Sequence, residues 1–202
     1  MKKTCCNDLA AAVHKHAVDQ GWWTEEREAA EIYALIHSEL SEALEEYRNG
    51  RPLLYYPCNA GGLCVDDSQE ENVSCGSRVY NPENPSAPCS AKSKKPEGIA
   101  IELADCVIRI LDYCGRRGID LDSETKRAAA FDRHALPALV NACHCLISRA
   151  YESAGREAGF LADCVALIEY WCGENGFELS EAIAIKHEYN KSRPYRHGGK
   201  KC

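Results

Sequence analysis

The stretch from Ile36 to Glu46 constrains the fold of this chain most. It is rich in helix-forming residues and contains neither glycine nor proline, so it predicts a helix. Apolar residues recur at helical spacing and form one stripe: Ile32, Ile36, Leu40, Ala43, Leu44 and Tyr47. Acidic residues three and four positions apart follow the edge of that stripe: Glu39, Glu42 and Glu46. We therefore expect a helix that packs on one side and carries carboxylates beside the packed face.

A second acidic pair occurs far downstream, where Glu102 and Asp105 stand three positions apart in another helical run. Two such pairs facing each other would form a cage of oxygen atoms, which suits a hard divalent cation. Four carboxylates this close would repel one another unless a cation neutralised them. The expected catalytic residues, which are also the ligands of Mg²⁺ or alternatively Mn²⁺, are Glu39, Glu42, Glu102 and Asp105.

The composition limits the partners and the location of the protein. Its 202 residues carry a formal net charge of −7, so we expect no binding to polymeric nucleic acid. The sequence has no run of about 18 apolar residues, so we expect no membrane span. The first residues include two lysines but no apolar segment typical of a secretory signal, which predicts a cytoplasmic protein.

Helical periodicity predicts an all-α fold, because the alternation typical of strands is nearly absent. The expected helices cover residues 5–20, 24–48, 97–116, 122–133, 136–154, 157–175 and 179–191. Thr24 is the expected N-cap of the second helix, and Asn49 with Gly50 ends it. Residues 51–96 are rich in proline and glycine, which predicts a long irregular insertion.

The chain contains 13 cysteines, for which buried packing and zinc binding are the two interpretations. In a reducing cytoplasm, cysteines in helical runs are expected to be small buried hydrophobic residues. These are Cys106, Cys114, Cys164 and Cys172. Four more lie in the predicted insertion: Cys58, Cys64, Cys75 and Cys89. None of these four is spaced as C-x-x-C, so zinc binding by residues 57–95 is the weaker alternative.

An internal repeat occurs at an offset of 58 residues. Ten of the 19 positions from 103 to 121 are identical to their counterparts in 161–179, which chance does not produce. We therefore expect one compact domain built from two tandem degenerate halves, residues 1–133 and 134–202.

The second half has lost the acidic groups of the first. The polar helix face of the first half carries Glu102, Asp105, Arg109 and Asp112. The corresponding positions of the second half hold Phe160, Asp163, Leu167 and Tyr170. In a weaker match upstream, the counterparts of Glu39 and Glu42 are Cys143 and Leu146. The second half therefore cannot form a site with several carboxylates.

The first half has lost polar groups that the second half keeps. The counterparts of Lys186, Tyr189 and Asn190 are Ala128, Phe131 and Asp132. From Lys186 to Cys202 the chain has six lysines and arginines but one acid, as a phosphate-binding segment would. We therefore expect one composite site, with carboxylates from the first half and basic and amide groups from the second. In such a site a metal polarises a phosphoryl oxygen and lowers the pKa of the water that attacks phosphorus.

These motifs together resemble the MazG-like all-α nucleoside triphosphate pyrophosphohydrolases. That family carries E-x-x-E on one helix and E-x-x-D on another, in a four-helix bundle with magnesium. Here the motifs are Glu39-Leu-Ser-Glu42 and Glu102-Leu-Ala-Asp105, followed by the Lys-Tyr-Asn-Arg-His-Gly-Gly pattern of the tail. The resemblance implies hydrolysis of a nucleoside triphosphate, often a deoxynucleotide, to the monophosphate and pyrophosphate. The nucleotide-binding residues that it implies are Lys186, Tyr189, Asn190, Arg193, Arg196 and Lys200.

The chain departs from this family in two ways. The gap between its acidic pairs is longer, because residues 57–95 look inserted. Family members also assemble identical subunits, whereas here the fused second half is expected to replace one subunit. Both a pseudo-dimeric monomer and a homodimer fit the sequence.

Two other functions remain open. One is a non-catalytic nucleotide sensor, and the other is a helical interaction module that uses the cysteine-bearing insertion. An acidic helix edge and a basic tail are also common solvated surfaces. Among the aromatic and histidine residues, Trp22 and Trp23 suit core packing or base stacking, and His37 and His144 suit structural roles. The sequence assigns no role to His197 or Asp163.

Overall fold

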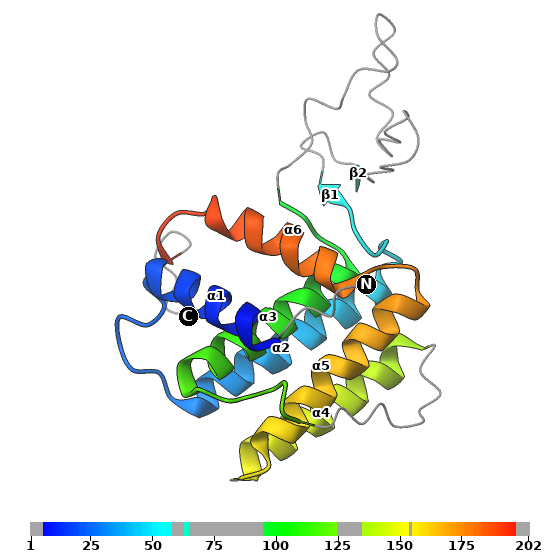
Figure 1. Cartoon of the computed structure of the whole chain (residues 1–202). Helices are drawn as coiled ribbons and strands as arrows, with labels where there is room; N and C mark the ends of the chain where they lie inside the picture. The colour runs from blue at the N-terminus through cyan, green and yellow to red at the C-terminus, as the bar shows by residue number, and fades with distance from the viewer. Residues whose placement is uncertain (1–5, 58–62, 65–94, 125–134, 154, 197–202) are drawn as a thin grey trace, which may run out of the picture.

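The computed structural model describes residues 6–57, 63–64, 95–124, 135–153 and 155–196. Most of these residues are helical, which confirms the all-α prediction (Figure 1). Six helices occupy the described segments: α1 (Cys6–Asp19), α2 (Ala29–Arg48), α3 (Ile99–Arg117), α4 (Leu136–Glu152), α5 (Glu157–Glu174) and α6 (Leu179–Lys191). Two short strands, β1 (Tyr56–Pro57) and β2 (Leu63–Cys64), pair antiparallel with Tyr56 opposite Cys64. None of the helices described combines the length and apolar character that a membrane crossing requires.

Helix α3 is the central element of the fold. It contacts α1, α2 and α6, and residues on almost every side of it are buried from Ile99 to Cys114. A helix that is apolar around most of its circumference belongs in a core. Its few polar residues are therefore drawn inside, among them Glu102.

Helices α4 and α5 pack against each other, and α4 also packs against α2 (Figure 1). All three helices carry fully buried side chains, such as Ile36, Leu40, Ile147 and Ile168. Burial of each such side chain contributes about 1.5–3 kcal/mol relative to exposure. One hydrophobic cluster includes residues of all six helices described, so both parts of the chain contribute to one core.

Two predicted helix boundaries are wrong. Helix α2 begins at Ala29 with Glu28 in the N-cap position, not at Thr24. The hydroxyl of Thr24 donates to the carbonyl oxygen of Gly21 at 3.1 Å, so it caps no helical amide. Residues 122–124 are not helical either, and the rest of the predicted helix at 122–133 lies outside the described residues. The carboxylate of Asp122 instead accepts hydrogen bonds from the first amides of α1, those of Cys6 and Asn7, at 3.1 and 2.8 Å.

The predicted insertion leaves and re-enters the helical core at one point. The amide of Tyr55 donates to the carbonyl oxygen of Glu97 at 2.8 Å, and the amide of Glu97 donates back at 2.9 Å. These two bonds bring the chain on both sides of the insertion to the N-terminus of α3. Most of the insertion, including Cys58, Cys75 and Cys89, lies outside the described residues, as does any test of zinc binding there.

The four helical cysteines that were expected to be buried are packing residues. Cys106, Cys114, Cys164 and Cys172 are buried free thiols. Cys143 is also buried, and its hydrogen bond with Cys164, together with burial, holds its pKa well above the usual value of a thiol. Cys143 is the counterpart of Glu39 in the weaker upstream match, so the second half has a core residue at that position.

Candidate metal and phosphate site

Three of the predicted acidic residues meet between α2 and α3. Glu39 comes from α2, and Glu102 and Asp105 come from successive turns of α3. One carboxylate oxygen of each lies within 4.8 Å of the other two. Glu39 and Glu102 are only 5% and 7% exposed, so these are not ordinary surface acids. The three carboxylates could hold a metal ion, and oxygen ligands of this kind suit Mg²⁺.

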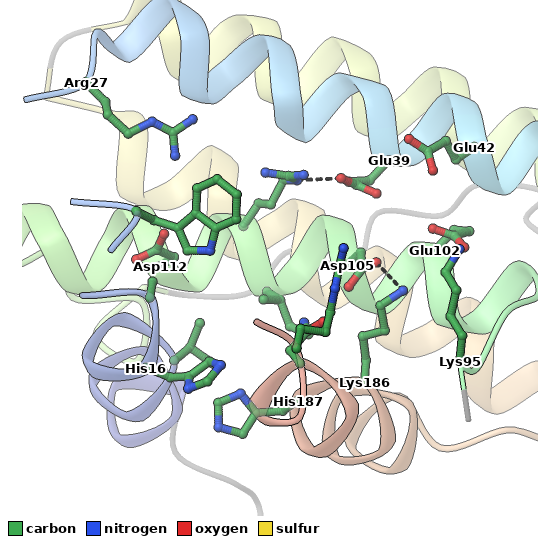
Figure 2. A pocket seen from close by; sticks show the side chains of 17 residues that line it. His16, Arg27, Glu39, Glu42, Lys95, Glu102, Asp105, Asp112, Lys186 and His187 are labelled. Carbon is green, nitrogen blue, oxygen red and sulfur yellow. Dashed lines mark hydrogen bonds and ion pairs between the residues drawn. The ribbon is translucent and has the colours of Figure 1, made fainter. Parts of the chain in front are cut away.

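The fourth predicted ligand, Glu42, stands apart from this group. Its side chain is exposed and is not part of the three-carboxylate cluster. It lies one turn beyond Glu39 on α2 and lines the same cavity (Figure 2). The structure thus places Glu42 at the rim of the site.

Two cations lie against the acidic cluster. The ammonium nitrogen of Lys186, on α6, is 2.6 Å from Oδ2 of Asp105, and this lysine is only 4% exposed. The Nε of Arg109, on α3, donates to Oε1 of Glu39 at 2.5 Å. The packing of α6 on α3 therefore brings a basic group from the end of the chain to carboxylates from its first half.

Burial dominates the electrostatics of the cluster. It raises the pKa of Glu102 to about 8, although the nearby charge of Lys186 opposes this shift. It also raises the pKa of Glu39, against the opposing effect of Arg109. Burial alone would lower the pKa of Lys186, but the carboxylates of Asp105 and Glu102 raise it, so the ammonium stays charged. A bound cation would favour the ionised form of every carboxyl group here.

A cavity of about 250 Å³ opens beside this cluster. Pockets for small molecules start near about 300 Å³, so the cavity suits part of one small molecule. Lys186 and Asn190 line it together, because residues four positions apart share one face of α6, and Arg193, which follows the end of that helix, lines it as well. The Oδ1 of Asn190 is buried and accepts no hydrogen bond from the residues described, so it lacks the donor that a buried acceptor normally has.

Two other predicted nucleotide-binding residues, Tyr189 and Arg196, lie outside the cavity lining. Tyr189 is not among the residues that line the cavity, and its ring lies 5.9 Å from the guanidinium of Arg193. Arg196 donates from Nε to the carbonyl oxygen of Gly21 at 3.0 Å and from Nη2 to the hydroxyl of Thr24. Arg196 thus fastens the chain after α6 to the loop after α1. Lys200 lies outside the described residues.

The far end of the cavity is formed by α1 and the loop that follows it. His16 and His187 meet edge to face there, with ring centroids 5.0 Å apart (Figure 2). Trp22 and Arg27 line the cavity as well. Trp23 is packed instead, with Nε1 donating to Asp112 at 2.9 Å.

Asp112 is a structural acceptor between α1 and α3. Besides the Trp23 indole, its carboxylate accepts a hydrogen bond from Nδ1 of His14 at 2.7 Å. His37 and His144 are likewise structural, since their rings stack at 4.9 Å with the Nδ1 atoms 2.7 Å apart.

Sequence reasoning missed three residues of this site. The sequence places Arg109 on the polar face of α3, four positions after Asp105. That spacing does not predict its ion pair with Glu39. His16 and His187 gave no signal, since their meeting depends on how α1 and α6 approach each other.

Comparison of the chain with protein-family models, with curated proteins and with solved structures finds no match. The functional argument therefore rests on the site itself.

Proposed function

We propose that the protein hydrolyses a nucleoside triphosphate, or its deoxy form, to the monophosphate and pyrophosphate, with Mg²⁺ or alternatively Mn²⁺ as cofactor. One observation carries this proposal. Three carboxylates suited to a divalent cation share a cavity with basic and amide groups suited to phosphate and sugar. The motif resemblance to the MazG-like pyrophosphohydrolases points to the same reaction.

The donor set fits the cofactor. Glu39, Glu102 and Asp105 offer hard oxygen ligands close together, and Mg²⁺ commonly binds through a few carboxylates plus substrate phosphates. When bound, the ion would polarise a phosphoryl oxygen and lower the pKa of a water molecule. The residues of the chain would hold the ion beside the scissile phosphate.

The remaining residues of the cavity have distinct roles in this proposal. Lys186 and Arg193 neutralise the negative charge of the triphosphate, because charged donors bind phosphate oxygens strongly. The unpaired Oδ1 of Asn190 accepts a hydrogen bond from the sugar or the base. Glu42, at the rim, adds negative charge close to the ion without holding it.

The packing of α4 against α2 is consistent with a second half that replaces a subunit. A pseudo-dimeric monomer then needs no partner chain to complete the site, since α6 already reaches Asp105.

The test is a panel of nucleoside and deoxynucleoside triphosphates incubated with Mg²⁺, with release of pyrophosphate as the readout. Wild-type protein should release pyrophosphate from at least one of them, and Glu39→Gln should not. If no triphosphate is cleaved by the wild type, the enzymatic proposal is wrong.

One observation favours a second candidate, a nucleotide sensor without catalysis. Arg109 and Lys186 already engage two of the three carboxylates. If these ion pairs persist, a nucleotide binds without a metal and is not cleaved. Calorimetry would then show nucleotide binding in the presence of a chelator, with no pyrophosphate formed.

A further inference from the structure

Arg109 lies where the buried acids meet the open cavity. Its side chain is 34% exposed, whereas that of its partner Glu39 is 6% exposed. The contact uses Nε of the guanidinium, and Glu39 is its one hydrogen-bond partner among the residues described. Its two terminal nitrogens make no hydrogen bond to the residues described, and the side chain lines the cavity.

A bound divalent cation gives the cluster a positive balance of charge. The cation favours the ionised form of Glu39, Glu102 and Asp105, so the ion, Arg109 and Lys186 then bring four positive charges to three negative ones. Charges in a buried site interact strongly, so this positive balance favours a polyanion.

The metal and Arg109 compete for the same carboxylate. An ion bound by Glu39 draws on the carboxylate that Arg109 contacts, and its charge repels the guanidinium. Arg109 lines the cavity, so a displaced guanidinium remains beside any phosphate bound there. Its planar fork matches phosphate oxygens in two-point contacts.

We propose that Arg109 is an exchangeable counter-ion: it neutralises Glu39 before a divalent cation binds, and it binds the triphosphate afterwards. This inference rests on the proposed function. Removal of the Arg109 charge should then raise the affinity for the metal and lower the affinity for the nucleotide. A purely structural role would not change the two affinities in opposite directions.

The test uses the full chain, stripped of metal, and calorimetry with two probes. The first is Mg²⁺ alone, and the second is a triphosphate with an imido group between its α and β phosphates, at saturating Mg²⁺. The variant Arg109→Met keeps the apolar stem and removes the charge. Arg109→Lys restores the charge, and Arg117→Met removes an exposed charge from the same helix as a matched control.

We expect Arg109→Met to bind Mg²⁺ about tenfold more tightly than wild type, because a competing charge is gone. The same variant should bind the imido analogue about tenfold more weakly, because a charged phosphate donor is lost. Arg109→Lys should return the Mg²⁺ affinity close to that of wild type. Arg117→Met should change neither affinity.

Three results would overturn the inference. If a folded Arg109→Met variant binds Mg²⁺ no more tightly than wild type, the competition does not exist, while the proposed hydrolysis can still stand. If the analogue binds equally well without Arg109, the transfer to phosphate is wrong. If wild type itself binds no divalent cation, both this inference and the proposed function fail.

Discussion

The ammonium nitrogen of Lys186 lies 2.6 Å from Oδ2 of Asp105, and it joins the last helix described to the central one. Both side chains are largely buried, with 5% and 17% of their side-chain surface exposed. Burying a lysine is costly unless an acid pairs with it, so the contact fixes the position of α6 on α3. The same contact delivers a phosphate-binding cation to the acidic cluster.

Replacement of Lys186 by Met should therefore have two effects. Nucleotide affinity should fall about tenfold to a hundredfold, the usual effect of losing a charged hydrogen bond. Stability of the metal-free protein should fall by about 2 kcal/mol, because Asp105 loses its partner. Saturating Mg²⁺ should restore much of that stability by pairing with Asp105.

Nucleotide titrations and urea unfolding with and without Mg²⁺ measure these effects. Lys191→Met is the matched control, since it removes an exposed lysine of the same helix that pairs with Glu188 at 3.0 Å. Equal nucleotide affinity in the two variants would contradict the role of Lys186.

Glu102 and Glu42 should differ in their importance for Mg²⁺ binding and turnover. Glu102→Gln should abolish Mg²⁺ binding and reduce turnover at least about a hundredfold, because Glu102 is buried within the cluster. Glu42→Gln should reduce turnover less than about tenfold, because Glu42 is exposed at the rim. Pyrophosphate release and Mg²⁺ calorimetry of both variants provide the comparison.

A chelator added to the wild type should reproduce the effect of Glu102→Gln. Activity that survives removal of divalent ions would exclude a catalytic metal. Equal losses in the two variants would mean that Glu42 is a full ligand, against the geometry.

The helices were predictable because their apolar residues recur at helical spacing. Glycines mark the ends of several of them, as Gly118 does for α3, where it adopts the left-handed conformation. The start of α2 was not predictable, because the hydroxyl of Thr24 bonds backward to Gly21. Such a local choice depends on the path of the loop, which the sequence pattern does not specify.

The acidic cluster was largely predictable, and the roles within it were not. The i,i+3 spacing places Glu102 and Asp105 on one face of α3, but it does not say that Glu42 stays at the rim. Lys186 and Asn190 share a face of α6, whereas Tyr189 lies off it. Tertiary packing decides which face of α6 meets α3. The motif of the tail alone therefore grouped Tyr189 and Arg196 with the cavity residues.

The His37–His144 contact should make stability depend on pH. Burial lowers the pKa of His37, and burial together with the charge of His37 lowers the pKa of His144. The unfolded chain then binds protons more readily than the folded one. Stability from this pair is therefore fully present above about pH 6.5 and is lost as pH falls through the folded pKa values.

Urea midpoints at pH 7.5 and pH 5.0 test this dependence. The decrease between the two pH values should be smaller in His144→Asn than in wild type, because the variant lacks one of the paired rings. The other histidines are common to both proteins and cancel in the comparison. Equal decreases would show that the stacked pair does not respond to protonation.

Gly98 should tolerate no side chain, and this position controls the start of α3. Its φ is 118°, and an added Cβ would lie 2.6 Å from the carbonyl oxygen of Leu53 and 2.7 Å from that of Pro52. Those carbonyls accept the first amides of α3, from Ala100 at 3.0 Å and Ile99 at 3.3 Å. Backbone carbonyls cannot move away by a change of rotamer, as a side chain can. Gly98→Ala should therefore break both hydrogen bonds and also strain the backbone at residue 98.

We expect Gly98→Ala to lose about 3 kcal/mol of unfolding free energy, from strain and lost hydrogen bonds together. Gly118→Ala is the matched control at the other end of α3: its φ is 66°, but nothing lies within 4 Å of the added carbon. It should lose about 1 kcal/mol from strain alone. Gly98→Ala should also weaken Mg²⁺ binding, because Glu102 lies one turn further along the displaced helix. Similar losses of stability in the two variants, with unchanged Mg²⁺ affinity, would show that the 52–53 carbonyls do not position the metal-binding turn.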